Sequence, residues 1–239
     1  MSISMAEPKE KGASGLCTRP CEKTIEPRDY VVLPKGKAHE AYAKTPRVSV
    51  LNVVRSLESL PDDEFTSDSI ADFLRRHPID LESIGRYTLF DSARYTRNRI
   101  ALNHRFEVML LCWEQGHATP VHNHDGQSCW VYLLSGKLSF TNYKWLGCDR
   151  GERTVHLKEL SRVPMAAEGS MNVIDERDAI HQLANEPAFG TRAISLHVYA
   201  KPLQTCVVYD AKAGNCWDQR LAYYSIDGVR VPALPQIIG

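Results

Sequence analysis

The chain has 239 residues, of which 43% are hydrophobic and 24% charged, so it is long enough to bury a core of its own. The 29 lysine and arginine residues balance the 29 aspartate and glutamate residues, which argues against binding of nucleic acid or an anionic membrane through excess positive charge. The longest purely apolar run, 108–113, is far too short to span a bilayer, and the N-terminus shows no apolar signal-peptide core.

The cysteine content predicts the compartment. The chain has seven cysteines, an odd number, and none of them forms a CxxC pair. A secreted framework of disulfides is therefore not expected, and a reducing cytoplasm is favoured. We also expect a monomer.

The first part of the chain differs from the rest. Residues 1–45 are rich in proline, lysine and glutamate, contain few large aliphatic side chains and follow neither helical nor strand periodicity. This composition predicts a disordered or loosely attached extension. We expect residues 46–239 to form a single folded domain.

Two short helices are predicted at the start of this domain. Residues 48–57 carry an apolar stripe at helical spacing, and Pro61 interrupts it. Ser67 or Asp68 is positioned to cap a second helix, which Pro78 ends. We expect both helices to pack against the outside of the structure that follows.

After residue 88 the pattern changes to that of strands. The apolar runs 106–113 and 128–134 each predict a buried strand, and Ser135-Gly136 predicts a turn into the alternating strand 137–145. Many short strands separated by turns are typical of an all-β sandwich or barrel. Further short strands are predicted at 154–160, 171–174, 192–199 and 205–209.

One pair of histidines has the spacing of metal ligands. In an extended segment His122 and His124 point to the same side, although two polar residues on a solvent-exposed face would show the same spacing. Gly116 stands before this pair, and Cys129 and Gly136 follow it. The spacing resembles the first metal motif of the cupin superfamily, G(x)5HxH(x)3–4E(x)6G, with Cys129 in the place of the usual glutamate.

A third histidine resembles the end of the second cupin motif. His181 is followed four positions later by Asn185, but Glu176 and Asp178 stand where the motif has PxG. The resemblance implies a mainly β fold, a cupin or jelly-roll barrel with a few N-terminal helices packed outside. Three neutral imidazoles would leave the full positive charge of a divalent metal available to an anionic ligand such as a thiolate.

Several blocks of sequence together resemble the cysteine dioxygenase family. They are Tyr95-Thr-Arg97-Asn98, the run 109–113, the HxH(x)4C segment and Ser195-Leu-His197-Val-Tyr199, and the resemblance extends over roughly residues 48–230. It implies one Fe(II) ion on His122, His124 and His181. It also implies that Arg97 binds the substrate carboxylate and that Tyr95 helps to hold the substrate or Arg97. Taken alone, Arg97 would be interpreted as a surface arginine in an ion pair, and the match of the Tyr95-Thr-Arg97-Asn98 block reverses this interpretation.

The same resemblance assigns roles beside the iron. Cys129 and Tyr199 match a cysteine–tyrosine thioether cross-link, a possible protein-derived cofactor. Ser195, His197 and Tyr199 lie on one face of a strand and match a relay in which Ser195 orients His197 and His197 bonds the Tyr199 hydroxyl. Without the resemblance, Cys129 and Tyr199 would be ordinary core residues and His197 a structural histidine.

The implied activity is the addition of both atoms of O2 to the sulfur of L-cysteine, giving cysteine sulfinic acid, a step of cysteine catabolism and taurine biosynthesis. One alternative is a dioxygenase for another small thiol, such as 3-mercaptopropionate. A second alternative is a non-catalytic metal-binding cupin, because fold does not determine function. The sequence contains no GxGxxG or P-loop motif that would indicate an organic cofactor.

Overall fold

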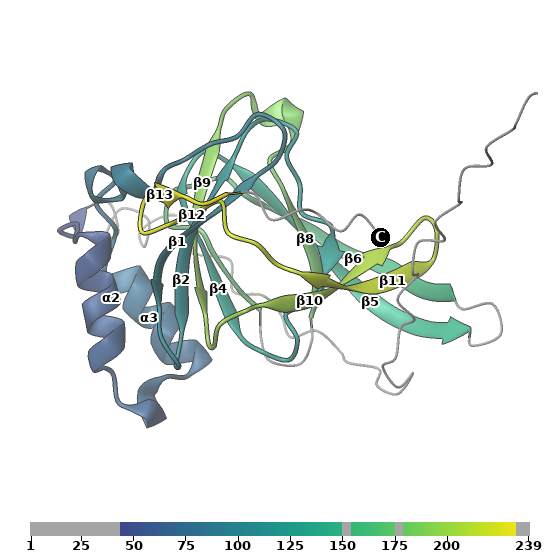
Figure 1. Cartoon of the computed structure of the whole chain (residues 1–239), viewed down its shortest axis with the longest axis horizontal. Helices are drawn as coiled ribbons and strands as arrows, with labels where there is room; N and C mark the ends of the chain where they lie inside the picture. The colour runs from purple at the N-terminus through teal and green to yellow at the C-terminus, as the bar shows by residue number, and fades with distance from the viewer. Residues whose placement is uncertain (1–43, 150–153, 175–178, 233–239) are drawn as a thin grey trace, which may run out of the picture.

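The structure is a computed structural model that describes residues 44–149, 154–174 and 179–232 (Figure 1). Almost all of the predicted N-terminal extension lies outside these ranges, as do Glu176 and Asp178. In the described ranges, no helix is both long enough and apolar enough to cross a bilayer.

The two predicted helices are present, and side chains cap both of them. Helix α2, Val50–Ser59, begins at Ser49, whose hydroxyl accepts the N–H of Asn52. Helix α3, Ser67–Arg76, begins one residue earlier than predicted, because Thr66 lies in extended backbone and its hydroxyl accepts the N–H of Ser69. The predicted cap at Ser67 or Asp68 was therefore wrong. Short 3-10 turns lie at Asp62–Glu64, Glu82–Tyr87 and Pro187–Phe189.

Two sheets form the rest of the domain. The first has seven strands in the order β13-β12-β1-β2-β9-β4-β7, and the second has six in the order β11-β10-β3-β8-β5-β6. Within the described ranges, neighbouring strands are antiparallel except β1 and β12, which are parallel. The strands of the first sheet are β1 Thr96–Leu102, β2 Glu107–Trp113, β4 Cys129–Ser135, β7 Met171–Ile174, β9 Ala193–Tyr199, β12 Ser225–Ile226 and β13 Val229–Arg230. Those of the second are β3 Val121–His122, β5 Leu138–Asp149, β6 Thr154–Met165, β8 Ile180–Ala184, β10 Thr205–Asp210 and β11 Asn215–Arg220.

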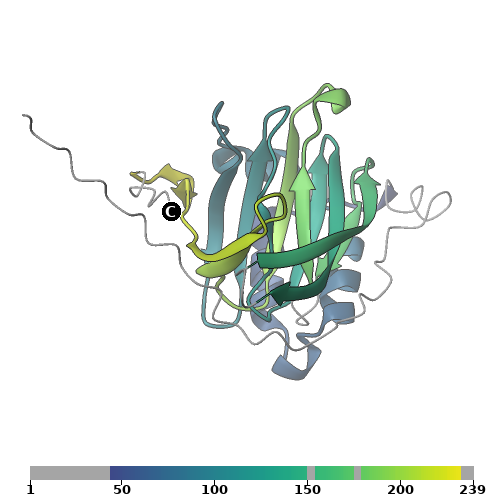
Figure 2. The same ribbon diagram turned by 90° about the vertical axis from the view of Figure 1, so that its right-hand side faces the viewer.

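The helices cover one face of the seven-stranded sheet, and the six-stranded sheet covers the other (Figures 1 and 2). Strand β2 shows why both faces can be buried: Val108 and Leu110 pack with the helices, whereas Met109, Leu111 and Trp113 face the space between the sheets. Alternate residues of a strand point to opposite faces, so a continuous apolar run is what such a strand requires.

This arrangement confirms the predicted mainly β barrel of the cupin type with helices outside. The predicted strands 106–113, 128–134, 137–145, 171–174, 192–199 and 205–209 are present, and β5 and β6 run further than predicted. Strands β1, β8, β11, β12 and β13 were not predicted, and β3 was expected only as an extended segment at His122 and His124.

Candidate metal centre

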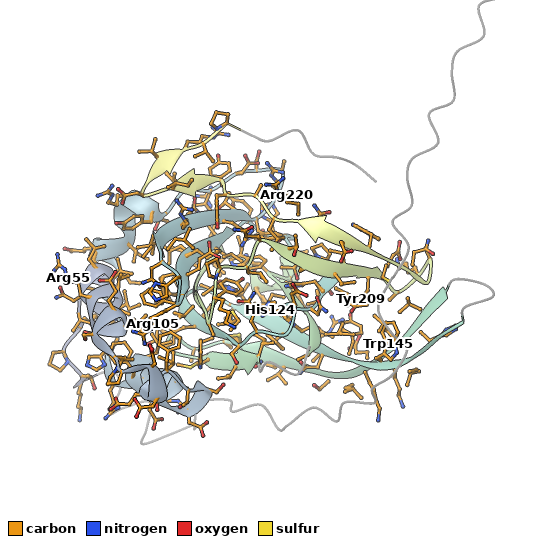
Figure 3. All side chains as sticks on the ribbon, turned by 60° about the horizontal axis from the view of Figure 1, so that its bottom comes forward. Arg55, Arg105, His124, Trp145, Tyr209 and Arg220 are labelled. Carbon is orange, nitrogen blue, oxygen red and sulfur yellow. The ribbon has the colours of Figure 1, made fainter. Side chains whose placement is uncertain are left out.

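Three histidines meet between the sheets. His122 on β3 lies directly opposite His181 on β8, and His124 follows two residues after His122. One ring nitrogen of each histidine lies within 4.8 Å of one ring nitrogen of the other two. Figure 3 shows His124 in the interior, far from Arg55 on the outer surface of α2.

Asn123 keeps the two neighbouring histidines on one side. Strand β3 ends at His122, yet the chain stays bound to β10, because the N–H of Asn123 donates to the Val207 carbonyl at 3.2 Å. The Asn123 side-chain oxygen in turn accepts the Val207 N–H at 2.9 Å. This reciprocal clamp allows His122 and His124 to share a side although β3 is only two residues long.

Backbone carbonyls orient two of the rings. Nδ1 of His122 lies 3.0 Å from the Pro120 carbonyl oxygen, and Nδ1 of His181 lies 3.2 Å from that of Ala179. A histidine that donates from Nδ1 has its Nε2 lone pair free, which is the usual arrangement of a metal ligand. Nε2 of His181 and Nδ1 of His124 are buried without a hydrogen-bond partner among the described residues. Such nitrogens fit a site built for a bound metal.

Burial keeps the three rings neutral. It is the main cause that lowers the pKa of His122 to about 4, and it also places the pKa values of His124 and His181 well below the usual range. The neighbouring histidines lower the pKa values of His124 and His181 further. Neutral imidazole is the form that binds a metal, and an all-nitrogen set suits divalent first-row transition metals.

Tyr199 and Cys129 lie beside the histidines. They are opposite each other across β9 and β4, and both are buried. The Tyr199 ring centroid is 5.3 Å from that of His124. Burial raises the pKa of the Cys129 thiol and of the Tyr199 hydroxyl well above their usual values, so both groups are protonated in the neutral pH range.

Ser195 and His197 form a hydrogen-bonded pair, but the predicted relay is not complete. The Ser195 hydroxyl lies 2.9 Å from Nε2 of His197 and accepts the indole N–H of Trp113 at 3.0 Å. No hydrogen bond joins His197 to the Tyr199 hydroxyl among the described residues. The reason is that Ser195 engages Nε2, and Nδ1, the other ring nitrogen, has no partner there.

Arg97 faces the same space from β1. Its side chain is buried, and one terminal nitrogen, Nη1, donates to the Ala222 carbonyl at 3.4 Å. The other, Nη2, is buried without a hydrogen-bond partner among the described residues. The Arg97 charge also lowers the pKa values of His124 and His197, after burial, so the guanidinium lies near the histidines. A buried guanidinium with one free nitrogen can accept a carboxylate.

Tyr95 has an aromatic neighbour that the sequence did not indicate. Its ring stacks on Trp113, with centroids 4.8 Å apart and planes 19° apart. Burial raises the Tyr95 pKa and the Arg97 charge lowers it, so the phenol still lies near Arg97. Trp113 thus supports Tyr95 and also donates to Ser195, a dual role that the sequence did not reveal.

Glu107 is the other residue that sequence reasoning missed. It is fully buried, lies opposite Tyr199 across β2 and β9, and accepts the N–H of Leu203 at 3.2 Å. Its second carboxylate oxygen has no hydrogen-bond partner among the described residues. A single glutamate at the start of an apolar run looks like an exposed strand end, so the pattern gave no signal.

Comparisons with known proteins identify the family of this chain. The family model for cysteine dioxygenase type I matches residues 40–212. Cysteine dioxygenase type 1 from Homo sapiens is 28% identical over 190 residues, 77% of this chain and 90% of the relative. That from Danio rerio is 26% identical over 187 residues, 76% of this chain and 89% of the relative. A solved structure with a double-stranded β-helix domain from Klebsiella pneumoniae is 12% identical, with a TM-score of 0.36, and the match covers 58% of this chain and 88% of that one. Because the family model matches well over half of its length, the chain belongs to the cysteine dioxygenase type I family.

Proposed function

We propose that the protein oxidises L-cysteine to cysteine sulfinic acid with O2, using one Fe(II) held by His122, His124 and His181. Fe(II), when bound, would supply the activation of dioxygen that amino-acid side chains cannot provide. The observation that carries the choice of a thiol with a carboxylate is the free, buried Nη2 of Arg97 beside the three histidines.

Arg97 would bind the substrate through its carboxylate. Its charge does not titrate away on burial, and its Nη1 is already fixed by Ala222, so the guanidinium is held in place before the substrate arrives. A carboxylate on Nη2 would satisfy the unpartnered nitrogen and compensate the buried positive charge. Orienting the substrate in this way brings its sulfur to a defined position.

Tyr199 would act as a hydrogen-bond donor during the reaction. Its phenol is protonated in the neutral range and its ring lies against His124, so the hydroxyl can donate to an oxygen atom that gains negative charge. A thioether to Cys129 would fix the ring from one side. We propose that Ser195 and His197 keep a neutral imidazole beside Tyr199, and that Tyr95, supported by Trp113, helps to hold Arg97.

Two alternatives differ in what they require. A dioxygenase for 3-mercaptopropionate would also use Arg97, because that thiol has a carboxylate, but it would not need room for an amine. Cysteamine, which has no carboxylate, would leave Nη2 of Arg97 unpaired. A non-catalytic cupin would need neither Arg97 nor Tyr199.

The decisive experiment measures O2 uptake and sulfinate with Fe(II)-loaded protein and each of the three thiols. We expect L-cysteine to give the highest kcat/KM and Arg97→Ala to raise its KM by about tenfold or more, the loss expected for a charge-assisted hydrogen bond. Arg55→Ala, on the exposed face of α2, is the matched control. Preference for 3-mercaptopropionate would refute the assignment of L-cysteine, and bound zinc or nickel without O2 uptake would favour the non-catalytic alternative.

A further inference from the structure

The segment 221–224 runs directly beside Arg97. The N–H of Tyr224 donates to the Arg97 carbonyl at 2.8 Å, while the Ala222 carbonyl accepts from the Arg97 guanidinium. This segment leads into β12 and lies beyond residue 212, where the match to the family model ends.

Tyr223 is the aromatic neighbour of Arg97 in this segment. The Arg97 guanidinium carbon lies 5.5 Å from the centre of the Tyr223 ring, and that of Arg99 lies 4.8 Å from it. Both distances are within the range of cation–π attraction. The Tyr223 ring also packs against the apolar side chains between the two sheets, so its position does not depend on the arginines alone.

Glu107 is the polar neighbour of Tyr223. Its carboxylate is fully buried and lies beside the Tyr223 hydroxyl, since it raises the Tyr223 pKa, after burial, while Arg99 and Arg97 lower it. The Leu203 N–H fixes one of its oxygens. Glu107 thus engages the Tyr223 hydroxyl, while the face of the ring is turned to the two arginines.

These contacts explain why Arg97 can keep one nitrogen free. A long arginine side chain has many rotamers, and its guanidinium can recognise a carboxylate only if its plane is fixed. Ala222 fixes Nη1 and the Tyr223 ring supports the guanidinium, whereas nothing among the described residues engages Nη2.

We infer that Tyr223 is a positioning residue that supports the Arg97 guanidinium and thereby makes the enzyme select thiols that carry a carboxylate. This inference rests on the proposed function. Tyr223 acts through Arg97, so it affects how a substrate is chosen and bound, and it leaves the chemistry at the sulfur to the residues around the three histidines.

The experiment compares Tyr223→Leu, Tyr223→Phe and Tyr224→Leu in the Fe(II)-loaded protein. Tyr224 is the matched control, because it lies in the same segment but its ring is 4.6 Å from Arg230 instead of Arg97. Binding of L-cysteine and of cysteamine is measured without oxygen by calorimetry, and KM and kcat are then measured with oxygen. Metal content and melting temperature confirm that each variant is folded.

We expect Tyr223→Leu to raise Kd and KM for L-cysteine about fivefold, as the loss of one cation–π contact predicts. The kcat of this variant should stay within about twofold of wild type. Its binding of cysteamine should be unchanged, because cysteamine has no carboxylate for Arg97. Tyr223→Phe keeps the ring and should stay close to wild type, and so should Tyr224→Leu. If Tyr223→Leu does not fold, Tyr223→Met fills a similar space without an aromatic face and gives the same test.

Two results would overturn the inference. One is an equal loss of affinity for L-cysteine and cysteamine, and the other is a Tyr223→Phe variant as impaired as Tyr223→Leu. Failure of the proposed function looks different, because the wild-type protein would then form no sulfinate from L-cysteine.

Discussion

Cys129 and Tyr199 are directly paired across β4 and β9, so the thiol and the phenol ring lie side by side next to His124. Paired residues in antiparallel strands have Cβ atoms about 4.5–5.5 Å apart, which brings the sulfur within reach of the ring. The backbone thus holds the two groups together before any bond is formed between them.

The first prediction is that Fe(II), O2 and L-cysteine produce the Cys129–Tyr199 thioether. A bond between the sulfur and a ring carbon removes two hydrogen atoms, so the intact mass should fall by two hydrogens during turnover. Peptide mapping should join the two strands through these residues. Cys129→Ser should abolish the mass change, and Cys112→Ser should not, because Cys112 lies against Thr96 and Asn98. An unchanged wild-type mass after many turnovers would exclude the cross-link and leave the metal site unaffected.

The second prediction concerns metal binding. His181 is fully buried, pairs with His122 and stacks on Phe140 at a centroid distance of 5.0 Å. His181→Ala should lower the Fe(II) content after loading from near one per chain to near zero, because it removes one of three ligands. His104→Ala, at an exposed position, should retain full iron content. Metal analysis of the gel-filtered proteins decides, and stoichiometric iron in His181→Ala would disprove its role as a ligand.

The third prediction separates the two glycines of the first cupin motif. Both have positive φ, +84° at Gly116 and +79° at Gly136. A Cβ at Gly136 would lie 2.1 Å from the Arg192 carbonyl oxygen, whereas a Cβ at Gly116 would meet only Pro187, at 3.9 Å. Gly116→Ala should lower the free energy of unfolding by about 1–2 kcal/mol, because its backbone conformation is unfavourable for alanine. Gly136→Ala should lower it by ~3 kcal/mol or more, because the clash also forces β4 to move away from β9. Urea unfolding measures both, and equal losses would contradict the argument.

The fourth prediction is a loss of stability at alkaline pH. Burial raises the pKa values of Cys112 and Cys206 from 9.0 to about 12. Between these values the unfolded chain has lost thiol protons that the folded protein still holds, so stability should fall as the pH rises from 9 towards 12. Each thiol contributes at most about 1.4 kcal/mol per pH unit.

Urea unfolding at pH 8 and pH 10.5 tests this dependence. Cys112→Ala should reduce the difference between the two stabilities, whereas a control substitution at an exposed residue such as His104 should not. In addition, native Cys112 should react with iodoacetamide far more slowly than the denatured protein does. Rapid labelling of native Cys112 would show that its surroundings are more open than the structure describes.

The sequence readily predicted strands such as β2 and β4, which are buried on both faces, whereas β1 was missed for a physical reason. Its alternating pattern is inverted: Arg97 and Arg99 lie on the inner side, where a strand normally has aliphatic residues, because that side belongs to the site. Strand β11 is mostly exposed and β12 and β13 have two residues each, so hydrophobic periodicity had nothing to detect.

The sequence was sufficient to predict which residues meet in the candidate site. It was not sufficient to predict the hydrogen bonds between them. Spacing and resemblance placed His122, His124 and His181 together, and the register between β3 and β8 agrees. The resemblance implied the contact between Ser195 and His197, but which ring nitrogen of His197 it engages could not be predicted, because strand periodicity gives the side of the sheet and not the rotation of a ring. The roles of Glu107 and Tyr223 depend on contacts between distant segments, and no local pattern encodes those.

The pairing of β12 with β1 also determines which part of the candidate site can form first in a newly made chain. The Ser225 hydroxyl donates to the Asn98 side chain across 127 residues of sequence, and segment 221–224, which precedes Ser225, covers one side of Arg97. During synthesis, all three histidines are present well before these residues emerge from the ribosome. The nascent chain therefore holds all three histidines of the candidate metal centre before segment 221–224 can pack beside Arg97.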